Sequence, residues 1–212
     1  MRSGHMATFV AAAPPFFVAV SAVATLMAPG YSSLSDTMSM LMGPGIPHPW
    51  VFQLGVVGYA LLIQFLGPLL YERVGRGRGG ALLCALVCIY SLTGILAAVF
   101  RNGYYQPVLG QFSENTIHDL VARISFSAVV LLSILTSWIL RNQKRWRVWR
   151  YYCLLIGVLV LALVTPFELE VWPSYLGLMQ RALFGVTILW VFVTALLLRY
   201  ESVSSKVEKL ED

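Results

Sequence analysis

Six long apolar stretches divide the chain, and polar or turn-forming residues separate them. They lie at about residues 8–27, 50–71, 81–100, 118–140, 151–167 and 175–200. A helix needs roughly 20 predominantly apolar residues to cross the hydrocarbon core of a bilayer, so each stretch is long enough for one crossing. The pattern predicts an all-α fold: a polytopic membrane protein with a six-transmembrane-helix bundle.

The composition agrees with a chain whose solvent is lipid. Hydrophobic residues make up 58% of the sequence and charged residues only 12%, whereas a soluble domain carries roughly 25% charged residues. We expect residues 7–200 to form one membrane domain and residues 201–212 to form a charged cytoplasmic tail. Residues 1–6 resemble a cloning remnant and are excluded from the functional argument.

The basic residues indicate an orientation. Most of the 15 Lys and Arg residues follow the second, fourth and sixth stretches, in the segments 73–78, 141–150 and 199–209. Positive charge next to a span is typical of the cytoplasmic side. The sequence therefore predicts a multi-pass protein of the cell membrane with both termini in the cytoplasm. Because these clusters adjoin spans, we read them as contacts with anionic lipid and expect no nucleic-acid partner.

The three cysteines, Cys84, Cys88 and Cys153, all lie within apolar stretches and are predicted to be small core residues. Cys84 and Cys88 share one helix face, but no His or Cys pair with matching spacing accompanies them. We expect neither a metal at these positions nor any cofactor.

A polar set gathers on the face opposite the basic loops. Its members in loops or at helix ends are Asp36, His48, Glu114, His118, Asp119, Glu168 and Glu170. Arg123 and Arg181 lie inside apolar stretches, where an arginine costs about 2.5–3.5 kcal/mol on insertion scales. Each arginine should therefore face a partner or water. Asp119 lies one helical turn before Arg123 and is suited to pair with it; Asp36, Glu168 and Glu170 are further candidates.

Two interpretations of the arginines remain open. In the first, a pocket opens to the outer leaflet between the fourth, fifth and sixth helices, and Arg123 and Arg181 hold an anionic group. Further ligand-binding residues are then Asp119, Glu168, Gln180 and Ser39, with the segment around Asp36 as a lid. In the second, the same charges form ion pairs that fasten the helices, and Asp36 and Ser39 only cap or anchor the outer segment.

His118 is the best candidate for catalysis, because a histidine oriented by a carboxylate can carry a proton. Asp119 points about 100° away on the same helix, so Asp36 or Glu168 would have to orient the ring, and Asp36 is the second catalytic candidate. A metal site built from His48, His118 and Asp36 is a less favoured alternative.

The run Tyr31–Leu41, which contains Ser35-Asp36-Thr37-Met38-Ser39, leads through a Gly/Pro linker to Trp50-Val51-Phe52-Gln53-Leu54-Gly55. This arrangement resembles the prokaryotic six-span family called domain of unknown function 998, and His118 and Arg181 also fit it. More remotely, it is similar to the damage-regulated autophagy modulators and glycolipid-anchor remodelling proteins. That second resemblance implies a lipid-related role, with Asp36 and His118 as the matching positions.

These observations predict an outward-facing polar cavity that binds or processes an amphiphile, with an anionic membrane lipid as the expected ligand. Whether the protein is an enzyme stays open. Two alternatives are a lipid carrier or flippase without catalysis, and a structural or sensory membrane subunit. The sequence does not indicate an oligomeric state.

Overall fold

The computed structural model describes residues 2–211, and the side chains of residues 4–200. It contains six helices that are long and apolar enough to cross a membrane, which confirms the predicted all-α polytopic fold. The spanning helices are α1 (Arg2–Leu26), α2 (Pro49–Ile63) with α3 (Leu66–Val74), α4 (Arg78–Val99), α5 (Glu114–Ile139), α6 (Arg147–Glu168) and α7 (Leu176–Glu211).

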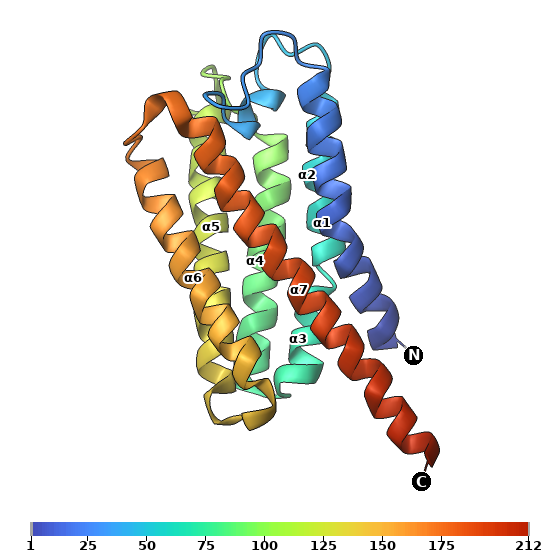
Figure 1. The fold of residues 1–212 in the computed structure, drawn as a ribbon. Helices are drawn as coiled ribbons and strands as arrows, with labels where there is room; N and C mark the ends of the chain where they lie inside the picture. Colours follow the sequence, from blue (N-terminus) through green and yellow to red (C-terminus); the bar gives the residue numbers. More distant parts are fainter. Residues whose placement is uncertain (1, 212) are drawn as a thin grey trace.

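The spans form a closed bundle (Figure 1). Helix α1 packs against α2 and α7, α4 packs against α2, α3 and α5, and α6 lies between α5 and α7. Side chains such as Phe17, Leu83, Leu132 and Trp190 are fully or almost fully buried in the common core. Because α7 contacts both α1 and α6, the first and last spans complete the ring.

The two ends of the bundle differ in charge. At the end where both termini lie, the chain turns from α3 to α4 and from α5 to α6, next to the basic segments 73–78 and 141–150 (Figure 1). The 3-10 turns η2 (Leu140–Asn142) and η3 (Lys144–Trp146) shape the second of these connections. The other end carries the segment between α1 and α2, with the 3-10 helix η1 (Met38–Met42). We call this other end, with its acidic residues, the polar end.

Two connections complete the polar end. The α4–α5 loop carries a short hairpin, β1 (Pro107–Leu109) and β2 (Phe112–Ser113), which the hydropathy pattern does not predict. The α6–α7 connection contains the 3-10 turn η4 (Pro173–Tyr175). Helix α5 begins at Glu114, earlier than predicted, because the Ser113 side chain accepts a hydrogen bond from the Thr116 amide and caps the helix.

The second span is broken, although the sequence predicts one continuous helix over residues 50–71. Helix α2 ends at Ile63 and α3 begins at Leu66. Pro68 explains the break, because proline has no amide hydrogen and its ring collides with the carbonyl of the residue four positions earlier, here Gln64. The apolar run itself continues through this point, so hydropathy alone does not reveal the interruption.

Candidate functional site: a two-compartment cavity at the polar end

Two adjoining hollows lie at the polar end of the bundle. The first, the polar compartment, has a volume of about 180 Å³. The structure lines it with residues from the α1–α2 segment, the α4–α5 loop, and helices α5, α6 and α7: Thr37, Ser39, Asn102, His118, Asp119, Ala122, Arg123, Phe126, Phe167, Glu168, Glu170, Leu176 and Gln180.

The second hollow, the apolar chamber, lies deeper and has a volume of about 80 Å³. Six aromatic side chains dominate its wall, together with small and apolar residues: Phe17, Phe52, Tyr59, Tyr90, Phe126 and Phe184. Both hollows share Ser39, His118, Ala122, Phe126 and Gln180, which we call the neck. A polar space therefore meets an apolar space at a ring of five residues.

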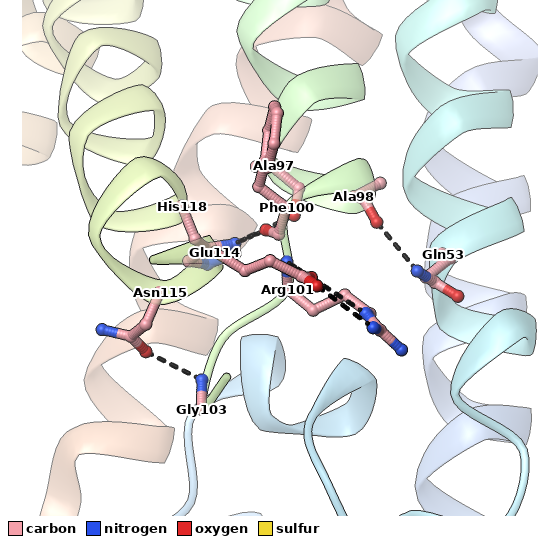
Figure 2. A network of polar contacts seen from close by, with 9 residues as sticks. All are labelled: Gln53, Ala97, Ala98, Phe100, Arg101, Gly103, Glu114, Asn115 and His118. Atoms are coloured by element: carbon pink, nitrogen blue, oxygen red, sulfur yellow. Dashed lines mark hydrogen bonds and ion pairs between the residues drawn. The ribbon is translucent and has the colours of Figure 1, made fainter. Parts of the chain in front are cut away.

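His118 is buried in the neck, with 5% of its surface exposed. Its Nδ1 lies 2.9 Å from the carbonyl oxygens of both Ala97 and Phe100, at the end of α4 (Figure 2). Both of these oxygens are acceptors, so Nδ1 carries a proton, and in the neutral imidazole Nε2 then holds a lone pair. Ala97 is also among the last residues of α4, whose carbonyls lack partners within the helix. One ring nitrogen thus caps α4, and the structure gives the other no partner among the described side chains.

The end of α4 is fixed to the start of α5 by further contacts (Figure 2). The Arg101 guanidinium donates to both carboxylate oxygens of Glu114, through Nε at 3.1 Å and Nη2 at 3.3 Å. Glu114 raises the pKa of Arg101 above its ordinary value, mainly through this hydrogen bond. The Gly103 amide donates to the Asn115 side chain at 2.7 Å. These contacts hold the two helix ends that meet at His118.

Arg123 forms its ion pair with Glu168 on α6, where its Nε lies 2.8 Å from Oε2. Glu168 was among the expected partners, and this pairing is confirmed. The predicted pair with Asp119 is not formed: the Asp119 carboxylate accepts a hydrogen bond from Asn115 Nδ2 at 2.9 Å. Arg123 reaches across to the neighbouring helix because Glu168 ends α6 at the same depth. Glu170, which lines the same compartment, lies in the turn just beyond with a positive φ of 48°.

A groove on the outer surface of the bundle continues from the polar compartment. It runs between α5 and α6 and is lined by Arg123, Phe126, Ser127, Val130, Leu131, Leu161, Val164 and Glu168. Arg123, Phe126 and Glu168 belong to both the groove and the compartment. The Arg123–Glu168 ion pair therefore stands where the outer groove meets the interior.

Arg181 has a different environment from the one predicted. Its Nη1 donates to the backbone carbonyls of Ser33 (2.8 Å), Asp36 (3.2 Å) and Gly177 (3.0 Å), and its Nη2 donates to the Tyr31 hydroxyl at 2.6 Å. It does not line the polar compartment. It borders a separate groove beside α1, lined also by Phe17 and Phe184, so the two arginines do not share one hollow, and a ligand-binding role for Arg181 stays a prediction. The expected acidic partner is not among its hydrogen-bond partners. Neutral carbonyl oxygens of the α1–α2 segment satisfy this guanidinium instead.

Tyr31 completes the contact between this segment and α7, and we call the contact the latch. Its hydroxyl donates to the carbonyls of Asp36 and Thr37 at 3.1 Å while it accepts from Arg181. Burial raises the pKa of Tyr31 above its ordinary value of 10.0, and the adjacent Arg181 opposes that shift. The start of α7 is also held by the segment, because the amides of Gly177 and Leu178 donate to the carbonyls of Ser35 and Leu34.

The predicted roles of Asp36 and His48 also change. The Asp36 carboxylate accepts from the Ser32 amide at 2.8 Å and from the Ser35 hydroxyl at 3.1 Å, so it stabilises a local turn. It lines neither hollow, and His118 is oriented by backbone carbonyls rather than by Asp36 or Glu168. His48 is exposed beside Trp50. Within residues whose side chains are described, no three His, Cys, Asp or Glu side chains come together as a metal site, so His48, His118 and Asp36 do not form one.

Gln180 and Ser39, two predicted ligand-binding residues, both reach the neck. The Gln180 Oε1 accepts a short hydrogen bond from the Met38 amide, which fixes η1 against α7. The Ser39 hydroxyl lies 3.0 Å from that of Thr37. The aromatic wall of the chamber is not among the residues predicted from the sequence. Its members come from five helices, and a sequence pattern of isolated aromatics in apolar spans does not distinguish them from ordinary core residues.

The fold and the charged cavity end define the class: an α-helical membrane protein with six spanning helices. The family described as "Protein of unknown function (DUF998)" matches residues 11–197. The chain therefore belongs to this family, which confirms the resemblance found in its sequence. No curated protein and no solved structure matches the chain.

Proposed function

We propose that this protein binds an amphiphile, with the polar head in the polar compartment and the apolar part in the aromatic chamber. The observation that carries the proposal is the shared neck, at which a space lined by charged side chains meets one lined by six aromatic rings. Binding sites for small molecules are typically concave and largely apolar, with a few placed polar groups. An amphiphile also has a polar part joined to an apolar part, so its two parts match the two hollows on either side of the neck.

The ligand reaches the cavity from the bilayer. The groove between α5 and α6 offers an apolar path that ends at Arg123 and Glu168. This ion pair is well suited to open, because Arg123 is largely exposed and exposed ion pairs contribute only about 0–1 kcal/mol. Basic loops at the opposite end are typical of the cytoplasmic side of a span, which supports a cavity that opens on the outer side of the cell membrane.

Blocking the neck tests this proposal. Ala122 lines both compartments, so the substitution Ala122→Phe fills the passage between them. The matched control is Ala85→Phe on the exposed outer surface of α4. Native mass spectrometry of protein purified in mild detergent, followed by lipid extraction, then compares the amphiphile retained by the wild type and both variants.

We expect the wild type and Ala85→Phe to retain a defined amphiphile and Ala122→Phe to lose it at an unchanged melting temperature. If Ala122→Phe destabilises the protein, Ala122→Leu provides a smaller obstruction. Equal retention by the wild type and a folded neck variant refutes binding in this cavity. So does the absence of any retained amphiphile from the wild type.

His118 supports a second candidate function, in which the bound amphiphile is also processed. Its capped Nδ1 leaves Nε2 free to accept a proton in the neck. His118→Asn keeps a side-chain N–H near the position of Nδ1 and removes Nε2, whereas His118→Ala removes both. With the retained amphiphile as substrate, loss of turnover in both folded variants supports catalysis; turnover by His118→Asn excludes Nε2 as the proton carrier.

A further inference from the structure

The charges that line the polar compartment do not favour an anionic head group. Its lining includes three carboxylates, Asp119, Glu168 and Glu170, and a single guanidinium, that of Arg123. Arg123 is paired with Glu168. The ion pairs recorded for the described side chains include neither Asp119 nor Glu170. The compartment therefore holds an excess of negative charge.

A second, independent feature also calls for a donor. His118 is 5% exposed, its Nδ1 is committed to the end of α4, and its Nε2 is an acceptor with no partner among the described side chains. Among the described side chains, Nε2 is not one of the buried atoms left without a partner; it faces open space, and His118 lies in the wall of both hollows. A ligand group that donates hydrogen bonds would satisfy it.

From these two features, and resting on the proposed function, we infer that the amphiphile carries an ammonium group, which Asp119, Glu170 and the Nε2 of His118 receive. An ammonium supplies three N–H donors and a positive charge. The carboxylates balance its charge, and His118 accepts one of its hydrogens.

The aromatic chamber fits the same ligand. Phe126 stands in the neck, and Tyr59 and Tyr90 line the chamber beyond it. Aromatic rings attract cations over their faces, so this wall is compatible with an ammonium at the neck. A sulfate or free phosphate group at this point would face the unpaired carboxylates, and like charges repel.

Two sources supply this chemistry: a zwitterionic lipid such as phosphatidylethanolamine, and a free alkylamine. The test uses the full chain, delipidated in detergent and incubated with equal amounts of phosphatidylethanolamine and phosphatidylglycerol that have identical acyl chains. Native mass spectrometry reports the ratio of the two bound lipids. We expect phosphatidylethanolamine to be favoured about tenfold, which corresponds to one well-placed charge contact.

Two variants sharpen the measurement. Asp119→Asn removes a compartment charge at constant shape and should lower the ratio at least about threefold. Glu72→Gln, an exposed position on α3 at the opposite end, should leave the ratio unchanged. His118→Asn should lower the ratio without loss of fold. If dodecylamine displaces the bound lipid from wild type, the ammonium group is sufficient for binding. If only phosphatidylethanolamine displaces it, and Arg123→Gln retains the lipid more weakly, the ligand is the zwitterionic lipid.

The outcomes separate the two proposals. If phosphatidylglycerol binds as well as phosphatidylethanolamine, or if Asp119→Asn leaves the ratio unchanged, the ammonium inference is wrong. In that case, loss of both lipids in Ala122→Phe still supports the amphiphile site. If wild type binds neither lipid nor dodecylamine, the proposed function fails as well.

Discussion

Arg123 and Arg181 lie at similar depth in two apolar helices, and the structure treats them in opposite ways. Arg181 directs its donors to three backbone carbonyls and a tyrosine hydroxyl, and it touches no carboxylate. Arg123 makes one recorded contact, to Glu168, and stands exposed between the outer groove and the polar compartment. The first arginine holds the latch together, whereas the second has one acceptor, Glu168, among the described side chains.

The role of an arginine in a membrane span depends on whether its N–H donors already have acceptors within the protein. Its position along the span does not distinguish a structural arginine from a ligand-binding one. A guanidinium has five N–H groups. Where neutral carbonyls of the same chain occupy them, no ligand is needed to satisfy the buried group. Where most of the N–H groups have no acceptor within the protein and lie next to a hollow, a ligand or water has to supply the acceptors. The predictions below test this distinction, beginning with the latch.

The largest effect is expected from Arg181→Met. It leaves the carbonyl of Ser33 without its donor and removes one of two donors to the carbonyl of Asp36, and hydrogen bonds from a charged group contribute about 1.5–3 kcal/mol each. We expect the free energy of unfolding in detergent to fall by about 2–4 kcal/mol. Chemical denaturation followed by tryptophan fluorescence measures it. Arg181→Lys, which keeps the charge but loses the fork of donors, should recover only part of the stability. Unchanged stability in Arg181→Met would show that these hydrogen bonds do not stabilise the fold.

Gly177→Ala should weaken the same latch by sterics alone. A Cβ at Gly177 would collide with the carbonyl oxygens of Asp36 and Ser33, which are backbone atoms that cannot rotate away. Overpacking of this kind costs about 1–3 kcal/mol. The control is Gly185→Ala on the same helix, where nothing lies within 4 Å of the new atom and helix propensity should raise stability. Equal melting temperatures for the two variants would contradict the close approach.

The latch should also weaken at alkaline pH. Burial raises the pKa of Tyr31 above 10.0, so the folded chain holds the phenol proton more tightly than the unfolded chain. The contribution of the neutral Tyr31 phenol to the free energy of unfolding is therefore complete below about pH 10. It is lost as the pH rises through the raised pKa. We expect the melting temperature of wild type to fall more steeply between about pH 9 and pH 11 than that of Tyr31→Phe. Parallel curves would exclude this titration.

The smallest effect on stability is expected from Arg123→Gln. Its side chain is 65% exposed, and exposed ion pairs contribute about 0–1 kcal/mol. The unfolding free energy should change by no more than this, while retention of amphiphile in native mass spectrometry should drop clearly. If Arg123→Gln lowered the free energy of unfolding as much as Arg181→Met, both arginines would be structural, and the proposed difference between them would be wrong.

Much of the fold follows from the sequence because hydropathy reports span length directly. The six spans and the position of both ends of the chain at the basic end were predictable on that basis. The break between α2 and α3 was not, since Pro68 lies in an uninterrupted apolar run. Pro68 itself, three residues before the predicted end at residue 71, is a local signal of the break, but Pro14, Pro15 and Pro166 lie within unbroken helices, so a proline alone does not decide it.

The candidate site was predicted only in part, for a physical reason. Glu168 as a partner of Arg123 follows from charge and depth. The partners of Arg181 and of the His118 Nδ1 are backbone carbonyls, which every residue carries and no sequence pattern marks. The excess of carboxylates in the polar compartment also emerges only when α5, α6 and the turn at Glu170 are brought together. For that reason the ammonium group that we infer differs from the anionic head group expected from the sequence.

The latch has a consequence for the order in which the protein is assembled. Tyr31 leaves the ribosome soon after the first span, but its partner Arg181 lies 150 positions later, on the last span. The α1–α2 segment therefore waits, without these contacts, through the insertion of four intervening spans. Docking of α7 both closes the helix ring and adds Gln180 to the neck. A chain that stops before α7 would lack the contacts of the latch and one wall of the cavity.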